Sequence, residues 1–542
     1  MKNYLLSIFK EAESEIPALK EISLAFEKPK VAEHGDISTN AAMLLSKKLK
    51  NNPRVIAQQI VNSLKIDQKV ISKTEIAGPG FINFFFTKEY VTYIIKKILD
   101  KKERFGKSER YAGKKANVEF VSANPTGPLT VGHGRNAVVG DTFANILEWV
   151  GYTVDREYYF NNAGRQMRVL GDSVKLRYLE IIGDQISFPE DYYQGEYIKE
   201  IAMHLYIKYG DSLKNESPEG IFKDTAENEI FFDIKKSLEN LGIVYKIFFN
   251  EYSLYQEGKI DELLNYFKVH NLTYEKDGAV WLKLKELGQP EDKVIVKSTS
   301  EPTYRLPDIA YHAVKINRGY DLLIDIFGSD HSATYPDVMA GIKAIGLDSD
   351  KVKVMIQQFV TITDGNEVVK MSTRKANYIT LDELNNEVGK DAVRYFFNMY
   401  NINSHMVFDL SIAKKKSDEN PVFYVQYAHA RINSILNRVK EAHLEISINN
   451  LDLLVHDDEQ NLIKTLFQFE EEVELSFEGL GTHRICSYLY ELAAAYHRFN
   501  KSCRILGTET KLAEARLALS YAAMIVIKNG LSILGVSAPE EM

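Results

Sequence analysis

The hydrophobic positions of this chain follow three successive patterns, the first of which mixes helix and strand. Residues 1–95 show helical periodicity around 2–27 and 38–63, and a strand pattern over 74–86 that a Gly-Pro-Gly turn interrupts. The spacing predicts a small α/β domain at the N-terminus.

The second pattern begins near residue 117 and gives the clearest local signal. NVEFVS (117–122) reads as a short strand, and ANPTGPLTV (123–131) as a loop broken by Pro and Gly. A helical pattern starts at Gly132 and stops near Gly151, after which YTVDREYYF resumes strand character. A strand, a helix and a strand in this order predict a βαβ unit, and hence a Rossmann-like, doubly wound parallel sheet.

Helical segments and acidic patches then occupy about 165–290, and strand patterns resume near 294, 321 and 352, which suggests an insertion between two half-sheets.

The third pattern is purely helical. After residue 420, amphipathic patterns predict an α-helical bundle over 422–444, 458–478, 482–506 and 511–534. The expected domains are therefore an N-terminal domain (1–95), a linker (96–115), a Rossmann-like domain with the insertion (116–410) and a bundle (411–542).

Composition narrows the class of protein. With 45% apolar and 26% charged residues, the chain of 542 residues is globular. Its two cysteines, Cys486 and Cys503, exclude a disulfide scaffold and a four-cysteine zinc site, and they suit a reducing compartment such as the cytoplasm. The N-terminus turns acidic too early for a signal peptide, and no run of about 18 apolar residues predicts a membrane span.

Charge is distributed unevenly along the chain. A net charge of −8 argues at face value against a nucleic-acid partner, but residues 1–110 carry a net +7 while the rest carries −15. Positive charge is densest in the linker, 96–115. That segment is either a solvated linker or a strip that contacts phosphates.

Two loops carry residue types suited to a nucleotide. Gly132-His133-Gly134 lies at the predicted start of a helix, where free N–H groups and the helix dipole favour phosphate, although a histidine there is more often a cap or a packed ring. The second loop has three cations in six residues and could hold a triphosphate or be an exposed basic turn; it comprises Lys370, Met371, Ser372, Thr373, Arg374 and Lys375. Between the two, Gly328, Asp330 and His331 follow a strand at an edge where ribose contacts are expected.

The order of these loops, the insertion and the bundle resembles a class I aminoacyl-tRNA synthetase. Several stretches are similar to bacterial arginyl-tRNA synthetases in particular: EFVSANPTGPLTVGHGR (119–135), PTYRLPDIAYH (302–312), VQYAHARINSIL (425–436), HGDISTNAAM (34–43), GPGFIN (78–83) and GVSAPEEM (535–542). The resemblance runs from about residue 30 to the last residue. It implies ATP-dependent ligation of L-arginine to tRNA(Arg) through an arginyl-adenylate, with Mg²⁺ bound to ATP and no dedicated metal site.

The resemblance also assigns residues to arginine and ATP. Glu119, Tyr304 and Asp308 would line the guanidinium pocket, and Asn124 would read the α-amino and carboxylate groups. A planar guanidinium asks for such carboxylates, although an ordinary ion pair is the alternative for Glu119 and Asp308. The ATP site would include Thr130, Gly132, His133, Gly328, Asp330, His331, Lys370, Met371 and Ser372, with His133, Lys370, Arg374 and Lys375 as catalytic residues.

For tRNA, the resemblance implies contacts at both ends of the chain. Asn83 and Phe86 of the N-terminal domain would read the D-loop, and Tyr427, Arg431 and Tyr496 of the bundle would read the anticodon, unless these aromatic rings are core. The expected protein is a monomer with no membrane partner.

Two positions depart from the family pattern. Thr130 stands where the first histidine of the HxGH motif is expected, and Thr373 where the KMSKS motif has its second lysine. Thr130 leaves a catalytically silent tRNA-binding paralogue as the alternative function. A cysteinyl-tRNA synthetase is disfavoured because the chain has no CxxC zinc motif.

Overall fold

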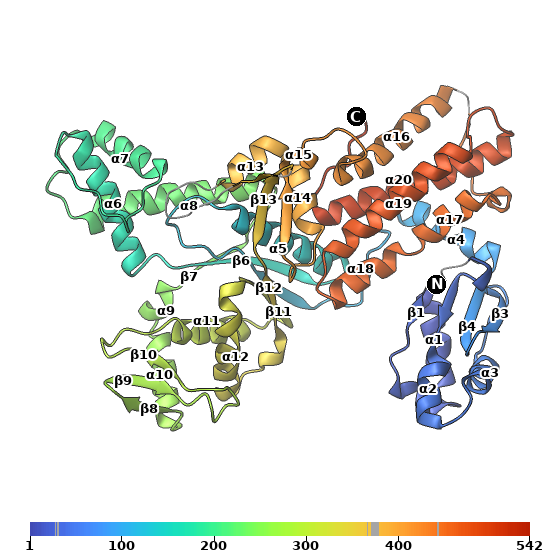
Figure 1. Ribbon diagram of the computed structural model, residues 1–542, viewed down its shortest axis with the longest axis horizontal. Coiled ribbons are helices and arrows are strands. Elements are labelled where there is room, and N and C mark those ends of the chain that lie inside the picture. The colour runs from blue at the N-terminus through green and yellow to red at the C-terminus, as the bar shows by residue number, and fades with distance from the viewer. Residues whose placement is uncertain (28, 30–31, 366, 370–378, 442–443) are drawn as a thin grey trace.

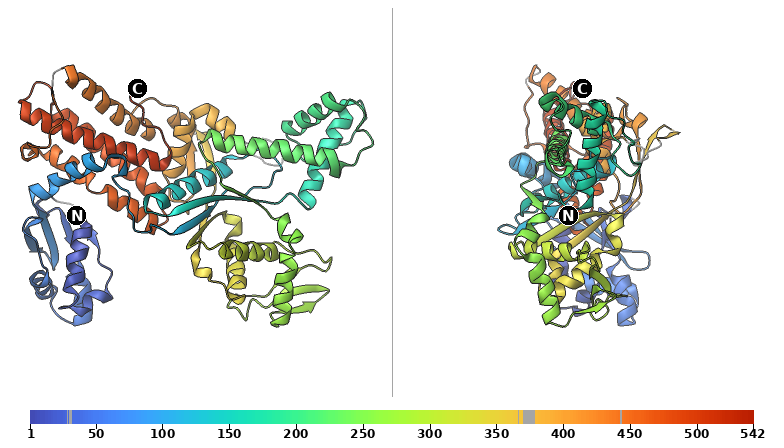
Figure 2. Two further views of the ribbon diagram at one scale, coloured as in Figure 1. Left: turned by 180° about the vertical axis from the view of Figure 1, so that it is seen from behind. Right: turned by 90° about the vertical axis from the view of Figure 1, so that its left-hand side faces the viewer.

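The computed structural model describes residues 1–27, 29, 32–365, 367–369, 379–441 and 444–542. A parallel sheet lies at the centre of an elongated molecule (Figure 1). A helical arm extends to one side of the sheet and the C-terminal bundle to the other, and a separate lobe lies below each of them (Figure 2). The sheet is therefore the element that all other parts adjoin.

The central sheet has the strand order β12-β11-β5-β6-β7, and all its strands are parallel. Its strands are β5 (Lys115–Glu119), β6 (Thr153–Phe160), β7 (Ile247–Asn250), β11 (Leu322–Gly328) and β12 (Val352–Gln357). Alternate residues face opposite layers, as the two-residue period of a strand requires. Ile324 and Ile326 join the core around α5 (Val131–Trp149), while Leu323 joins a second core with α11 (Arg305–Asn317) and α12 (Tyr335–Ala344). This arrangement confirms the predicted doubly wound fold.

Close packing of α5 onto the sheet depends on a glycine. A Cβ at Gly140 would lie 2.3 Å from the ring of Phe120, directly after β5. The helix starts at a capping box between Thr130 and His133, and this fixes its first turn at the carboxyl edge of the sheet.

The N-terminal domain and the bundle complete one side of the molecule. The domain contains α1 (Lys2–Ala12), α2 (Ala41–Leu49), α3 (Pro53–Ser63) and an antiparallel sheet of β1 (Phe26–Glu27), β2 (Ile37–Thr39), β4 (Phe81–Phe86) and β3 (Ile71–Ala77). Helix α4 (Lys88–Lys101) follows it and packs against the bundle. The bundle contains α16 (Pro421–Glu441), α17 (Asp457–Leu466), α18 (Phe469–Glu478), α19 (His483–Ser502) and α20 (Thr510–Leu534).

The remaining elements surround the carboxyl edge of the sheet. The arm consists of α6 (Arg165–Ile181), α7 (Glu196–Tyr209) and α8 (Lys223–Asn240), and the lower lobe adds α9 (Tyr252–Gln256), α10 (Lys259–Val269), β8 (Thr273–Lys276), β9 (Ala279–Leu282) and β10 (Lys293–Val296). A small sheet of β14 (Glu367–Val368), β13 (Val360–Asp364) and β15 (Met406–Asp409) lies beside α13 (Leu381–Val388), α14 (Lys390–Asn398) and α15 (Leu410–Ala413).

Five sequence expectations about elements were wrong. The strand near 294 is β10, which pairs antiparallel with its neighbour β9 and not with the parallel sheet. The stretch 165–290 is not one insertion, because β7 inside it joins the central sheet. Helical periodicity over 2–27 ends at Ala12, and 38–63 is divided before Pro53, whose ring suits the first turn of a new helix. The pattern 458–478 similarly forms two helices, α17 and α18.

Helix α20 is long and apolar enough to cross a membrane, contrary to the expectation that no segment would qualify. Of its most apolar 18-residue window, 78% is buried inside the protein. Its composition is thus explained by its place in the bundle core.

The basic linker does not lie free in solvent. Lys97 pairs with Glu470 at 2.5 Å, and Arg110 pairs with Glu474 and Glu478 at 2.9 and 3.0 Å. All three acids lie on α18. Neither interpretation from sequence included this outcome, in which the positive strip docks against an acidic helix; we call it the linker–α18 contact.

Candidate functional site

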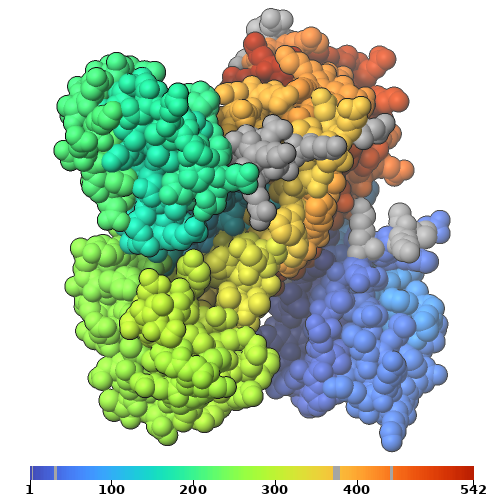
Figure 3. Space-filling model, turned by 60° about the vertical axis from the view of Figure 1, so that its left-hand side comes forward, coloured from blue at the N-terminus to red at the C-terminus, as the bar shows by residue number. Residues whose placement is uncertain are grey.

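A cleft of about 640 Å³ opens at the carboxyl edge of the central sheet. In Figure 3 a hollow separates the arm above from the α9–α12 lobe below. The cleft brings together residues that the sequence placed in two separate ligand sites: Glu119, Asn124, His133, Tyr304, Asp308, Gly328, Asp330 and His331. Thr130 and Gly132 do not line it.

One end of the cleft is acidic. Glu251 follows β7 and is buried, with Oε2 accepting from the Tyr159 hydroxyl at 2.5 Å and Oε1 accepting from the Asn161 amide at 2.9 Å. Burial raises the pKa of Glu251. Burial also raises the pKa of Asp308, to about 7, and the charges of Glu251 and Glu119 add to this shift against the opposing charge of His312. A cation placed between these carboxylates would relieve their repulsion.

Glu119 lies in the floor of the same end and already has a cation. Its Oε2 accepts from Lys315 Nζ at 2.6 Å and from the Tyr311 hydroxyl at 2.9 Å, while Oε1 accepts from the Ser122 hydroxyl at 3.0 Å. Lys315 also pairs with Asp325 of β11, and both side chains are fully buried. Glu119 is therefore a neutralised carboxylate, whereas Asp308 and Glu251 face the cleft with no lysine or arginine paired to them among the described residues.

Two tyrosines lie near the acidic end. Tyr304 lines the cleft one helical turn before Asp308 and is 81% exposed. Burial, with Glu251 and Asp308 nearby, raises the pKa of Tyr255 to about 12. Asn124 is fixed between neighbours, since its amide donates to Gln166 at 2.9 Å and its oxygen accepts from the Asn161 backbone at 2.9 Å.

The opposite end of the cleft is formed at the start of α5. His133 Nδ1 accepts from the Thr130 backbone N–H at 3.2 Å, which leaves the ring proton on Nε2. Burial lowers the pKa of His133, so the ring is a neutral donor and not a cation at neutral pH. The Thr130 hydroxyl accepts from the His133 backbone N–H at 3.5 Å and serves as the cap of the helix.

The two glycines beside His133 have different environments. A Cβ at Gly132 would meet only the Thr130 hydroxyl, at 3.6 Å, and so leaves open space. At Gly134 it would lie 2.4 Å from Leu381 of α13, so this glycine permits helix packing and not the approach of a nucleotide.

The segment that follows the basic loop lies against the start of α5. Lys370, Met371, Ser372, Thr373, Arg374 and Lys375 lie outside the described residues. Directly beyond them, Thr380 forms a β-bridge with Thr130, and the Leu381 N–H donates to the Leu129 carbonyl at 2.8 Å. The chain therefore returns from the basic loop at the N-terminus of α5.

Gly328 is the last residue of β11, Asp330 and His331 follow it, and all three line the cleft together with His133. The His331 ring stacks on Phe327 at 5.1 Å between centroids. Among the described residues, no group of three or more His, Cys, Asp or Glu side chains could hold a metal ion.

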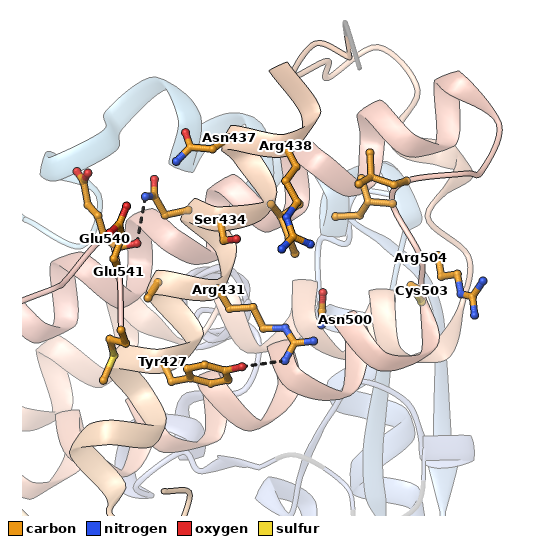
Figure 4. A pocket seen from close by; sticks show the side chains of 16 residues that line it. Tyr427, Arg431, Ser434, Asn437, Arg438, Asn500, Cys503, Arg504, Glu540 and Glu541 are labelled. Carbon is orange, nitrogen blue, oxygen red and sulfur yellow. Dashed lines mark hydrogen bonds between the residues drawn. The ribbon is translucent and has the colours of Figure 1, made fainter. Parts of the chain in front are cut away.

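A second pocket, of about 860 Å³, lies in the bundle (Figure 4). Arg431 donates to the Tyr427 hydroxyl at 3.3 Å, and both side chains line the pocket with Arg438 and Arg504. The C-terminal segment forms one wall, where Asn433 donates to the Glu540 carbonyl at 3.1 Å. The pocket thus presents an aromatic ring and several guanidinium groups.

Three side chains expected to contact tRNA are buried, and these expectations are corrected. Asn83 is 2% exposed within the N-terminal sheet. Phe86 stacks on Tyr90, which in turn stacks on Phe467 of the bundle, so this ring belongs to a domain interface. Tyr496 is fully buried on α19. The aromatic side chains of Phe86 and Tyr496 therefore belong to hydrophobic packing.

Sequence reasoning missed Glu251 and the side chains that support Glu119. Glu251 directly follows a strand at the same edge as Gly328, so the rule that ligands bind at the carboxyl ends of parallel strands could have found it. The failure came from assigning 165–290 entirely to an insertion. Lys315 carries no such signal, since its role depends on where α11 packs.

Comparison with family models covers nearly the whole chain. "Arginyl tRNA synthetase N terminal domain" matches residues 3–86, "tRNA synthetases class I (R), catalytic domain" matches 94–433, and "DALR anticodon binding domain" matches 425–542.

Curated relatives agree with these matches. An arginine–tRNA ligase of Salinibacter ruber is 46% identical over 566 aligned positions that cover all of both chains. Another, of Desulfotalea psychrophila, is 47% identical and covers 95% of this chain and 94% of its own. The solved arginyl-tRNA synthetase of Thermus thermophilus shares the fold over the full length of both chains, with a TM-score of 0.81 at 21% identity.

Proposed function

The chain belongs to the arginyl-tRNA synthetase family, and on that premise we propose that it joins L-arginine to its tRNA in an ATP-dependent reaction. The arginine carboxylate attacks the α-phosphorus of ATP and pyrophosphate leaves. A terminal hydroxyl of the tRNA then attacks the carbonyl of the arginyl-adenylate and AMP leaves. Neither step needs a protein nucleophile, so catalysis rests on positioning and charge stabilisation.

One observation supports this function above the others: Asp308 and Glu251 form an acidic end of the same cleft whose opposite end is formed by His133. A guanidinium carries five N–H donors and a permanent charge, and two carboxylates with raised pKa values are suited to receive it. The Tyr304 ring would cover one of its faces. Glu119, neutralised by Lys315, supports the floor.

ATP is proposed to bind at the other end, with its Mg²⁺ as part of the substrate. His133 would donate its Nε2 proton to a phosphate oxygen, and Gly132 would leave room at the helix N-terminus. Asp330 and His331 are proposed to contact the ribose side. Lys370, Met371, Ser372, Arg374 and Lys375 are retained as proposed phosphate contacts on their sequence pattern alone.

The role of Thr130 removes the reason to interpret the chain as a catalytically silent tRNA-binding paralogue. Its hydroxyl caps α5 and does not line the cleft, so threonine at this position preserves the helix start that carries His133. The family relationship likewise favours the active enzyme.

The bundle pocket is proposed to hold bases of the anticodon. An exposed Tyr427 ring can stack on an unpaired base, and Arg431, which lies 5.9 Å over that ring, can contact the backbone. Replacement of Tyr427 by Ala should raise the KM for tRNA and leave the KM for arginine unchanged. The monomeric state and the cytoplasmic location remain predictions, the first of which sedimentation would measure.

The deciding experiment is ATP–pyrophosphate exchange with each of the twenty amino acids, with and without tRNA, followed by tRNA charging. We expect exchange and charging with arginine alone. Absence of both under every condition, or charging with another amino acid, would contradict the proposal.

A further inference from the structure

One acidic residue interrupts the apolar interior of the central sheet. Strand β11 reads LLIDIFG, and Asp325 in its middle is fully buried on the face that α11 covers. A buried carboxylate is costly unless charged or hydrogen-bonding groups surround it. Lys315 of α11 is one such group. The other is His312, one turn earlier on the same helix.

His312 is held between two acceptors. Its Nε2 lies 3.0 Å from Asp325 Oδ2, and its Nδ1 lies 2.7 Å from the backbone carbonyl oxygen of Asp308. A carbonyl oxygen can only accept, so Nδ1 must donate. The Asp325 carboxylate, charged beside Lys315, can also only accept, so Nε2 must donate as well. The ring satisfies both contacts only as an imidazolium.

The charges around His312 support this state. Asp325 of β11 and Glu119 of β5 face it with negative charge, while Lys315 opposes it from its own helix. Asp308 carries a carboxylate one turn away, and Glu251 acts on Asp308 from the other side of the cleft. From α12, Asp337 is neutralised by Arg305, and α10 presents the apolar Ile260, Leu263 and Phe267 to this core. Burial alone would lower the pKa of His312, but the hydrogen bond and charge of Asp325 outweigh it and raise the pKa.

Asp308, on which arginine recognition is proposed to depend, sits in the first turn of α11, where the backbone is fixed by few helical bonds. The bond from His312 ties the carbonyl of this same residue to the sheet, through Asp325.

We propose that His312 is a positioning residue of the guanidinium pocket, held as an imidazolium that fastens the Asp308 carbonyl in α11 to Asp325 in β11. This inference rests on the proposed function, because it assigns to His312 the placement of the carboxylate that binds arginine. When His312 loses its proton, one of the two bonds is lost and Asp308 is no longer held in place. Arginine binding then weakens, whereas ATP, at the other end of the cleft, is unaffected.

The test uses the full chain with tRNA and measures kcat and KM for arginine and for ATP from pH 6 to 10. In the wild type, kcat/KM for arginine should fall at alkaline pH as His312 deprotonates, with no matching fall for ATP. His312→Asn and His312→Gln replace the ring by amides that do not titrate. The Asn amide nitrogen corresponds to Nδ1 and keeps the bond to the Asp308 carbonyl, while the Gln amide corresponds to Nε2 and keeps the bond to Asp325.

We therefore expect the KM for arginine to rise about tenfold in His312→Gln and about threefold in His312→Asn, as the loss of one charged hydrogen bond predicts. The KM for ATP should stay within about twofold, and the alkaline fall assigned to His312 should be absent from both variants. His270→Asn is the matched control, because His270 also contacts the carbonyl four residues earlier, at 2.9 Å, but lies on the surface end of α10. The ionisation of arginine itself affects all variants alike.

Equal losses for arginine and ATP, an unchanged KM for arginine, or an alkaline fall that persists in both variants would overturn the role of His312. If the variants fail to fold, an equal pH response for arginine and ATP in the wild type would overturn it as well. These results are distinct from failure of the proposed function, in which the wild type shows no arginine-dependent exchange at any pH.

Discussion

Two ionic contacts of this protein use the same residue types with different consequences. In the linker–α18 contact, Lys97 and Arg110 meet glutamates with side chains that are 24 to 51% exposed. In the cleft floor, Lys315 meets Glu119 and Asp325 with side chains that are at most 4% exposed. Water and salt screen the first contact, whereas the second lies where an unpaired charge is expensive.

The two contacts have different roles: the exposed one attaches parts of the molecule to each other, and the buried one positions side chains of the cleft. The exposed contact holds two domains side by side, and each of its pairs is worth at most about 1 kcal/mol. The buried contact sets where the carboxylates of the cleft lie. Removal of one partner of the buried contact should cost more free energy than the intact contact contributes, because the other partner is then left as an unpaired buried charge.

Breaking the buried contact should therefore have the largest effect on stability. Lys315→Met leaves Glu119 and Asp325 without their common cation, and we expect the free energy of unfolding to fall by about 3–5 kcal/mol. Urea unfolding would measure this change. Lys343→Met, on the exposed surface of α12, is the control and should change stability by less than about 0.5 kcal/mol. Similar losses in the two variants would contradict the distinction.

Removal of a cleft carboxylate should affect function more than stability. Asp308→Asn keeps the shape of the side chain but removes its charge, and we expect kcat/KM for arginine to fall by about 10²-fold or more, equivalent to about 2.7 kcal/mol or more. The KM for ATP should change little. Pyrophosphate exchange with tRNA present measures both quantities. Equal losses for the two substrates would refute the guanidinium role.

Arginine binding should release a proton near neutral pH. Because the pKa of Asp308 is raised to about 7, the free enzyme holds a proton there below this pH, and a bound guanidinium displaces it. Affinity for arginine should rise with pH up to about 7 and stay level until the alkaline fall that we assign to His312. Calorimetry in buffers of different ionisation enthalpy should show release of about one proton at pH 6 and almost none at pH 8.5. Asp308→Asn should abolish the release.

The exposed contact should give the smallest effect. Arg110→Ser removes two ion pairs with α18, and we expect a loss of stability of about 1 kcal/mol or less, which vanishes in molar salt. Urea unfolding at low and high salt would show it. If the variant instead raised the KM for tRNA at unchanged stability, the linker would contact RNA.

Local signals in the sequence were sufficient for much of the fold. The βαβ unit was predictable because NVEFVS, the loop with Pro125 and Gly127, and the helix from Val131 each have the residues their structure requires. The antiparallel pairing of β10 was not predictable, since a strand of four residues with three apolar side chains does not indicate which neighbour it will join.

The candidate site shows the same division. His133 and Asp308 were named from sequence, and both line the cleft. Tyr496 and Phe86 were named for their aromatic rings, yet both are buried, because aromatic residues at helical or strand spacing serve a core as well as they serve RNA.

The sequence by itself determined the order of the domains, the family and most of the residues that could meet substrates, because these depend on short motifs and on hydrophobic periodicity. Only the tertiary structure decided which charged side chains are paired and which are ionised. It paired Lys315 with Glu119, placed His312 between two hydrogen-bond acceptors and brought the basic linker against α18. Ionisation and pairing depend on distance and burial, which arise only when segments far apart in the chain come together.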